Sequence, residues 1–218
     1  MSEFELDAGT IGARTPGHYG AAATDVTLAE TSFAAAWNVQ GDPARAPFLA
    51  ELRRLFEVDL PLIPNTTARG AAWTAFWLGP RSWLLVARAN AKLQLDAFTA
   101  HRDALNGAGG ALFDLSASRV AFEIGGKRGA TVLAKGCPLD FHSRAFPAGT
   151  CAQSLLGHIS ALIWRSDETP AFTVMVARSL ARDAWRALCV SAAQYGYDIY
   201  SLPANSRFDF FNRASLPK

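Results

Sequence analysis

The chain has 218 residues, of which 50% are hydrophobic and 18% charged, a composition that excludes a disordered chain. Its 21 basic and 19 acidic residues leave a net charge of +2, which lacks the basic excess of a nucleic-acid-binding surface. No uninterrupted apolar run approaches the ~18 residues of a transmembrane helix. The acidic start, MSEFELDAGT, does not have the basic-then-apolar order of a secretory signal.

The first half of the chain is predicted to contain an arm and one α+β repeat. Residues 1–25 have little periodicity and are interpreted as an arm, either loose or laid on a partner. The first repeat covers 26–105, where alternating apolar residues predict strands and a spacing of three to four predicts helices. The expected strands are 35–40, 73–78 and 82–87, and the expected helices are 44–56 and about 91–105.

The second half is predicted to repeat this plan after a Gly-rich linker at 106–110. The second α+β repeat covers 111–195, and a C-terminal tail covers 196–218. The expected strands are 119–124, about 150–157, 159–165 and 171–177, and the expected helices are 127–135 and 181–195.

Short matches between the halves indicate a duplication. Val86-Ala87-Arg88 recurs 90 residues later as Val176-Ala177-Arg178, and Leu49-Ala50 recurs 84 residues later as Leu133-Ala134. Each match falls on the same predicted element of its half. The order of strand, helix, two strands and helix predicts an α+β fold of duplicated ferredoxin-like units, with antiparallel sheets and helices packed on them.

The three cysteines, Cys137, Cys151 and Cys189, contain no CxxC pair. Their odd number argues against a disulfide framework, and their spacing argues against a zinc site. We interpret them as small buried thiols, with reactive thiols as the alternative. The absence of a disulfide framework favours a cytoplasmic location.

Catalytic signatures are incomplete. The segment 107–112 imitates a dinucleotide-binding glycine motif but has Leu at its last position and follows a predicted helix, and 125–128 resembles only part of a phosphate loop. Asp114 is either a general base or the organiser of a turn, and the turn is the commoner role. His142 and His158 are either surface or structural residues or functional ones, as ligand contacts or proton carriers, and we favour the structural role.

Several segments resemble a known family. Leu112–Ser116, the strand that follows and the Gly126-opened helix are similar to the folate-binding fold of aminomethyltransferases. The more particular segments resemble gamma subunits of heterotetrameric sarcosine oxidases; they are Val26–Glu30, Leu78–Leu85, Lys135–Asp140, Phe146-Pro147 and Cys151–Gln153. This resemblance covers roughly residues 26–195.

The resemblance implies a subunit of a flavin-dependent complex that oxidatively demethylates sarcosine. It implies alpha, beta and delta subunits as partners, with FAD, covalent FMN, NAD, tetrahydrofolate and zinc held by those subunits and no cofactor or metal in this chain. In catalytic aminomethyltransferases a Gly-Gly-Ile segment leads into paired aspartates, and the comparable stretch here is Gly157–Ile163. Ser160, Ala161 and Leu162 stand where a carboxylate would be needed to stabilise a developing positive charge.

We therefore expect a non-catalytic subunit that supports assembly. The alternative is a stand-alone folate-binding or aminomethyltransferase-like protein. No catalytic, cofactor-binding or metal-binding residue is predicted in this chain.

The C-terminal tail is rich in aromatic residues, which a free disordered tail normally lacks. These side chains either fold back on the chain or, as we prefer, dock with the N-terminal arm on a large partner subunit. Aromatic residues flanked by Arg are typical interface anchors. The predicted interface residues are Tyr197, Tyr200, Phe208, Phe210 and Phe211.

Overall fold

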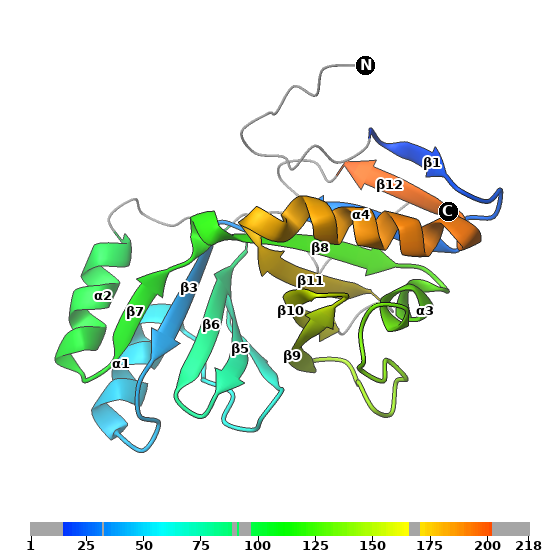
Figure 1. Ribbon diagram of the computed structural model, residues 1–218. Helices are drawn as coiled ribbons and strands as arrows, with labels where there is room; N and C mark the ends of the chain where they lie inside the picture. The colour runs from blue at the N-terminus through cyan, green and yellow to red at the C-terminus, as the bar shows by residue number, and fades with distance from the viewer. Residues whose placement is uncertain (1–14, 32, 89–90, 92–96, 166–170, 202–218) are drawn as a thin grey trace. The chain divides into compact units, whose positions relative to one another are not determined.

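The computed structural model describes residues 15–31, 33–88, 91, 97–165 and 171–201 (Figure 1). These residues divide into two compact units. One is built on a seven-stranded sheet and takes its residues from 15–31, 118–148 and 153–201; the other is built on a five-stranded sheet and takes them from 33–117 and 149–152.

The five-stranded unit has the ferredoxin-like arrangement. Its elements in chain order are β3 (Ala35–Gln40), α1 (Ala46–Phe56), β4 (Thr67–Arg69), β5 (Trp73–Gly79), β6 (Ser82–Ala87), α2 (Ala97–Gly107) and β7 (Ala111–Asp114). The sheet order is β4-β5-β6-β3-β7, and each neighbouring pair is antiparallel. The first and last strands of the repeat therefore lie side by side, which is the split βαβ plan.

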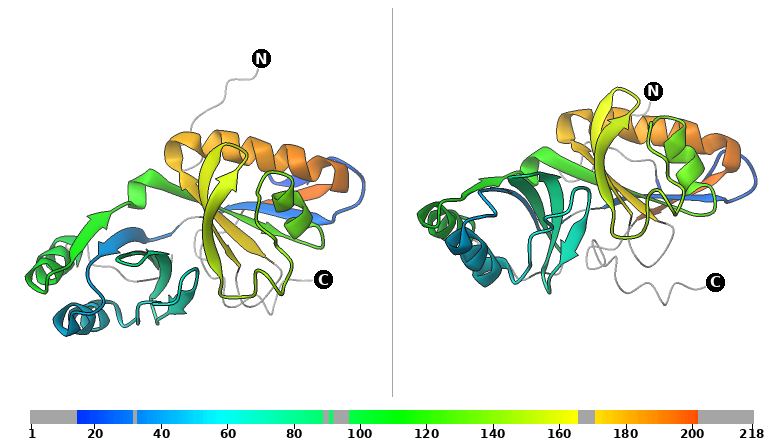
Figure 2. Two further views of the ribbon diagram at one scale, coloured as in Figure 1. Left: turned by 60° about the horizontal axis from the view of Figure 1, so that its bottom comes forward. Right: turned by 90° about the horizontal axis from the view of Figure 1, so that it is seen from below.

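The two helices of this unit pack together beside its sheet (Figure 2). An aromatic core lies between the sheet and these helices. Alternate residues of each strand face the core, and α1 contributes Phe48, Leu52 and Phe56, spaced by one helical turn. The ring of Trp37 lies 4.7 Å from that of Trp73 and 6.0 Å from that of Phe56. Burial of this helical face is the main force that holds α1 on the sheet.

The seven-stranded unit contains the remaining elements. They are β1 (Gly17–Tyr19), β2 (Val26–Thr31), β8 (Arg119–Gly125), α3 (Gly129–Ala134), β9 (Cys151–Leu156), β10 (Ile159–Arg165), β11 (Phe172–Ala177), α4 (Ala181–Ala192) and β12 (Tyr197–Ser201). The sheet order is β1-β12-β2-β8-β11-β10-β9. β12 runs parallel to β2, whereas β2 is antiparallel to β8.

The two units repeat one topology. The order β3-α1-β4-β5-β6-α2-β7 corresponds element by element to β8-α3-β9-β10-β11-α4-β12. The sheets also agree, except that β2 lies between β8 and β12, and β1 adds a further strand outside β12. The prediction of a duplicated α+β fold with antiparallel sheets is confirmed.

Three predicted boundaries need correction. Val26–Thr31, assigned from the sequence to the first repeat, pairs with β8 of the second. Part of the predicted arm, Gly17–Tyr19, and part of the predicted tail, Tyr197–Ser201, form strands that pair with each other. In each case the strand is held by a partner far away in the chain, which local periodicity does not reveal. β1 and β12 are also too short for a clear period. Residues 1–14 and 202–218 of the arm and tail lie outside the described residues.

Candidate interface on the terminal strands

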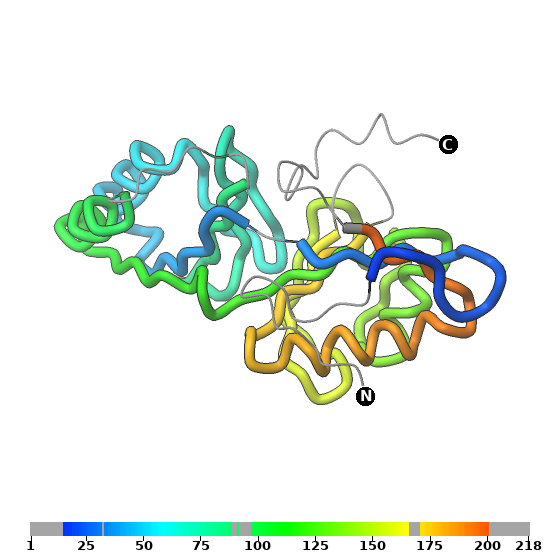
Figure 3. The backbone as a smooth tube through the Cα atoms, turned by 90° about the horizontal axis from the view of Figure 1, so that it is seen from above, coloured from blue at the N-terminus to red at the C-terminus, as the bar shows by residue number. Residues whose placement is uncertain are grey.

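The predicted interface residues that the structure describes lie on β12. Tyr197 and Tyr200 belong to this strand, whereas Phe208, Phe210 and Phe211 lie outside the described residues. β12 runs between β2 on one side and β1 on the other. In Figure 3 the dark-blue backbone of β1 runs beside the orange-red backbone of β12.

Tyr197 belongs to the core of its own unit. Its side chain is 2% exposed and stacks on Tyr19, its direct cross-strand partner, with ring centroids 5.6 Å apart and an interplanar angle of 24°. Such a pair stabilises strand association beyond the area it buries. Tyr197 is therefore covered by this chain itself, while Tyr200, three residues later, is 51% exposed.

Two glycines allow the segment between β1 and β2 to pack closely against the backbone just before β12. Gly196 has a φ of +66°, and a Cβ there would collide with the Ala23 carbonyl oxygen. Gly20 has a φ of +84°, and a Cβ there would collide with the Ala193 carbonyl oxygen. Both positions need glycine, because the conformation is left-handed and the neighbouring backbone is too close for a side chain.

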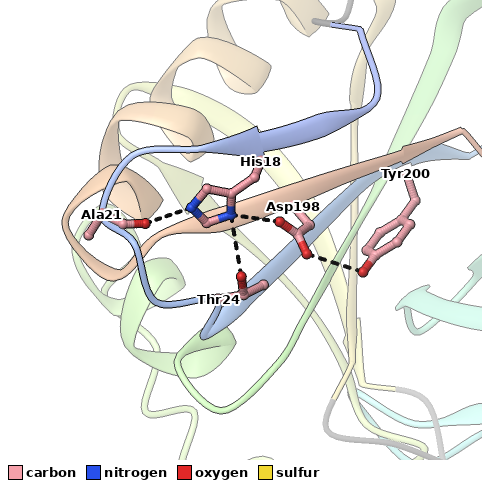
Figure 4. Close-up of polar contacts among 5 residues, drawn as sticks. All are labelled: His18, Ala21, Thr24, Asp198 and Tyr200. Carbon is pink, nitrogen blue, oxygen red and sulfur yellow. Dashed lines mark hydrogen bonds and ion pairs between the residues drawn. The ribbon is translucent and has the colours of Figure 1, made fainter. Parts of the chain in front are cut away.

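A polar cluster joins β1, the β1–β2 turn and β12 (Figure 4). His18 Nδ1 lies 2.8 Å from Asp198 Oδ1 and 3.3 Å from Thr24 Oγ1, and His18 Nε2 lies 2.7 Å from the Ala21 carbonyl oxygen. The Tyr200 hydroxyl donates to Asp198 Oδ2 at 3.3 Å. A catalytic triad needs a nucleophile at the nitrogen opposite the carboxylate, and here a backbone carbonyl occupies that place.

The motifs and patterns of the sequence do not single out His18 or Asp198 as site residues. They lie 180 residues apart, and each stands in a segment without a catalytic motif. Neither periodicity nor spacing relates two such residues, so nothing in the sequence alone distinguished this pair.

Asp114 organises a turn. Its Oδ1 accepts hydrogen bonds from the backbone N–H and the hydroxyl of Ser116. The Ser116 Oγ in turn accepts a hydrogen bond of 2.9 Å from the backbone N–H of Ala36 on β3. The interpretation of Asp114 as the organiser of a turn is confirmed. The side chains of Asp114 and Ser116 together hold the end of β7 beside β3.

The two histidines weighed from the sequence lie in turns, and the three cysteines are buried. His142 Nδ1 accepts a hydrogen bond from the Arg144 backbone N–H at 3.3 Å, within a turn, and His158 lies exposed in the β9–β10 turn. All three cysteines are free and buried, as predicted. Burial raises the pKa of the Cys151 thiol to about 12, so its reactive thiolate is scarce at neutral pH.

The segment that resembles a phosphate loop is a tight turn. Gly126 has a φ of +88°, and a Cβ there would collide with the Asp25 carbonyl oxygen. That same oxygen accepts a hydrogen bond of 3.0 Å from the Arg128 backbone N–H. The glycine is required by the approach of the chain before β2, and the six-residue α3 that follows is too short to present an anion site.

The stretch compared with the aspartates of aminomethyltransferases lies at the start of β10. Ser160 is exposed, whereas Ala161 and Leu162 are buried, with 4% and 6% of their surface exposed. These apolar side chains contribute to the core of the seven-stranded unit. None of Ser160, Ala161 and Leu162 carries a carboxylate that could stabilise a cationic amine.

One cavity of about 180 Å³ lies at the C-terminal end of α1 in the five-stranded unit. Its apolar wall is made by Leu49, Leu52, Val58, Leu60 and Leu62. Its polar rim is the ion pair between Arg53 and Asp59, whose side chains are 71% and 69% exposed. An exposed ion pair of this kind contributes little to stability, and the cavity presents no acid–base pair to a bound molecule.

Among the described residues two kinds of feature are absent, a cluster of metal ligands and a membrane-spanning helix. No three side chains of His, Cys, Asp or Glu gather there as a metal ion would require. No helix among them is long and apolar enough to cross a membrane.

The fold is shared with solved structures. A heterotetrameric sarcosine oxidase from Corynebacterium sp. U-96 superposes with a TM-score of 0.71 and 26% identity, over 81% of this chain and 88% of the matched chain. The glycine cleavage system aminomethyltransferase T from Bartonella henselae superposes with a TM-score of 0.58 and 16% identity, over 85% of this chain and 50% of that one. The chain is thus a protein of the aminomethyltransferase-like α+β fold.

Similarity in sequence identifies the family to which the chain belongs within this fold class. The sarcosine oxidase, gamma subunit family matches residues 40–194. Curated gamma subunits of sarcosine oxidase from Corynebacterium sp. (strain P-1) and Arthrobacter sp. are 34% and 35% identical over 150 residues, which is 68% of this chain and 71% of each relative. The chain belongs to the sarcosine oxidase gamma subunit family, and the resemblance stated from its motifs is confirmed.

Proposed function

We propose that this chain is the gamma subunit of a heterotetrameric sarcosine oxidase and that it supports assembly without catalysing a reaction itself. The curated relatives carry the name of that subunit, and the similar solved structure is described as a heterotetramer. Its proposed partners are the alpha, beta and delta subunits, and its proposed location is the cytoplasm.

The observation that carries the non-catalytic role is the composition of β10. In the segment that resembles the carboxylate-bearing stretch of aminomethyltransferases, Ala161 and Leu162 are buried among apolar residues and Ser160 points to solvent. An amine substrate gains no charge stabilisation from such side chains. As the resemblance to the family implies, we propose that FAD, FMN, NAD, tetrahydrofolate and zinc are held by the other subunits.

The first experiment uses the purified chain alone. We expect no turnover of sarcosine or other N-methyl amines, no flavin absorbance and no calorimetric heat of binding with tetrahydrofolate. Stoichiometric flavin or measurable turnover would contradict the non-catalytic role. Tight binding of tetrahydrofolate would favour the alternative, a stand-alone folate-binding or aminomethyltransferase-like protein.

The second experiment concerns where the chain docks. We propose that the aromatic C-terminal segment and the N-terminal segment contact a large partner subunit. Of the predicted interface residues that the structure describes, Tyr200 is exposed and therefore available for this contact. Deleting residues 204–218 is expected to weaken co-purification with the alpha and beta subunits while leaving the melting temperature of the isolated chain unchanged. A large loss of thermal stability with assembly intact would instead show that the deleted segment folds back on this chain.

A further inference from the structure

The imidazole of His18 lies between two groups that only accept hydrogen bonds. Nδ1 is 2.8 Å from the Asp198 carboxylate, and Nε2 is 2.7 Å from the Ala21 carbonyl oxygen. A neutral imidazole carries one N–H, so it can donate to one of these acceptors but not to both. The imidazolium carries two, and both contacts are then hydrogen bonds.

When the imidazolium loses one proton, one of its two hydrogen bonds is lost. If the remaining hydrogen is on Nε2, the lone pair of Nδ1 faces the carboxylate of Asp198, and only the Thr24 hydroxyl, 3.3 Å away, is able to donate to it. If it is on Nδ1, the lone pair of Nε2 faces the Ala21 carbonyl oxygen. Either tautomer places two electron-rich atoms within hydrogen-bond distance without a proton between them.

The cluster occupies the junction that holds β1 in the sheet. β1 has three residues, and its neighbour in the sheet order is β12 alone. His18 and Asp198 are direct cross-strand partners in this pair. The next pair along the strands, Tyr19 and Tyr197, projects from the opposite face of the sheet, as alternation requires. So short a strand depends on such side-chain pairs for its attachment.

We propose that His18 is a protonation-sensitive clasp that fastens the N-terminal strand β1 to the C-terminal strand β12. The imidazolium bridges Asp198 of β12 and the Ala21 carbonyl of the β1–β2 turn, and the neutral ring releases one of the two. The groups that face it from the packed elements are the Asp198 carboxylate, the Thr24 hydroxyl and the Ala21 carbonyl, with the Tyr200 hydroxyl bound to the far oxygen of Asp198.

The direction in which the pKa of His18 is shifted agrees with these contacts. The hydrogen bond to Asp198, and then that to the Ala21 carbonyl, raise the pKa of His18 above its ordinary value of 6.5. A raised pKa means that the folded strand pair binds the proton more tightly than the free chain does. The stabilisation is therefore fully present below pH 6.5 and is lost as the pH rises through the raised pKa. The His18 side chain is 40% exposed, so protons reach it from solvent.

The clasp also fixes how the two ends of the chain leave the sheet. Because β1 and β12 are antiparallel, Gly17 at the start of β1 lies opposite Ile199, near the end of β12. The chain therefore enters β1 and leaves β12 at the same end of the strand pair. Protonation of one imidazole therefore strengthens the attachment of β1 to β12, alongside the Tyr19–Tyr197 pair, and this holds whether or not the proposed assembly role is correct.

The test is carried out on the full-length isolated chain. The His18 titration is followed by NMR of the imidazole C–H signals, and amide exchange of residues 15–24 is measured at about pH 5.5 and about pH 8.5, on either side of the imidazole range and corrected for intrinsic rates. The variants are His18→Gln and Asp198→Asn. The matched control is His158→Gln, an exposed histidine in another turn of the same unit.

We expect the His18 midpoint to lie above 6.5 in the wild type and to fall in Asp198→Asn. Protection of residues 15–24 is expected to decrease at the higher pH in the wild type and in His158→Gln, and to be low and independent of pH in His18→Gln. A wild-type midpoint at or below the ordinary value, or equal protection at both pH values, would overturn the proposal. If His18→Gln does not fold, the wild-type titration and Asp198→Asn still decide the question.

Discussion

Replacing Tyr197 by Ala tests whether β12 is part of the fold. Tyr197 is 2% exposed and stacks on Tyr19 at 5.6 Å, so the substitution removes a buried aromatic ring and its stacking contact with Tyr19. Large-to-small changes of this kind cost about 3–5 kcal/mol, of which about 0.5–1.5 kcal/mol belongs to the aromatic pair. For a chain of this size, a loss of about 3 kcal/mol lowers the melting temperature by roughly 10 °C.

The same strand offers a matched control. Tyr200 is 51% exposed, and Tyr200→Ala is expected to change stability by less than about 0.5 kcal/mol. Urea unfolding followed by circular dichroism gives both values. If the two variants have the same stability, or if Tyr197→Ala equals the wild type, β12 is not held against this chain and the fold-back of Tyr197 is wrong.

Three further predictions concern single positions. Gly196→Ala should destabilise the chain by about 2 kcal/mol or more, because the new Cβ meets the Ala23 carbonyl; a melting temperature equal to the wild type would refute the close approach. Ser116→Ala should cost about 1–2 kcal/mol in a denaturant titration, because the Ala36 N–H loses its acceptor; a neutral effect would mean that another group replaces it. Cys151 should resist alkylation in the native chain at pH values well below about 12 and react on unfolding, as mass spectrometry of the labelled peptide can show; rapid native labelling would contradict its burial.

Much of the fold was predictable because local signals define it. β3 and β6 begin and end where alternation predicts, since each has a buried face and a turn of Gly and Pro residues beside it. The amphipathic pattern likewise located α1 and α4. The internal matches predicted the duplication because both units bury the same faces of the same elements.

The terminal strands were not predictable in this way. β1 has three residues and β12 five, too few for a period, and their pairing joins positions 17–19 to 197–199. The pairing of β2 with β8 likewise joins segments that are far apart in the sequence. The His18 cluster depends on the pairing of β1 with β12, so it could not be predicted from the sequence either. The absence of a carboxylate from β10, by contrast, was readable from the sequence, because it concerns which residues are present rather than which residues meet.

Co-purification from the native host tests the central claim most directly. The chain is tagged in place and isolated under mild conditions, and the eluate is analysed for its subunits and for sarcosine-dependent oxidation. Membership of a heterotetrameric sarcosine oxidase predicts that the tagged chain elutes with three other subunits, a flavin spectrum and sarcosine-oxidising activity. Elution of the chain by itself, with the oxidase activity left behind intact, would contradict the account.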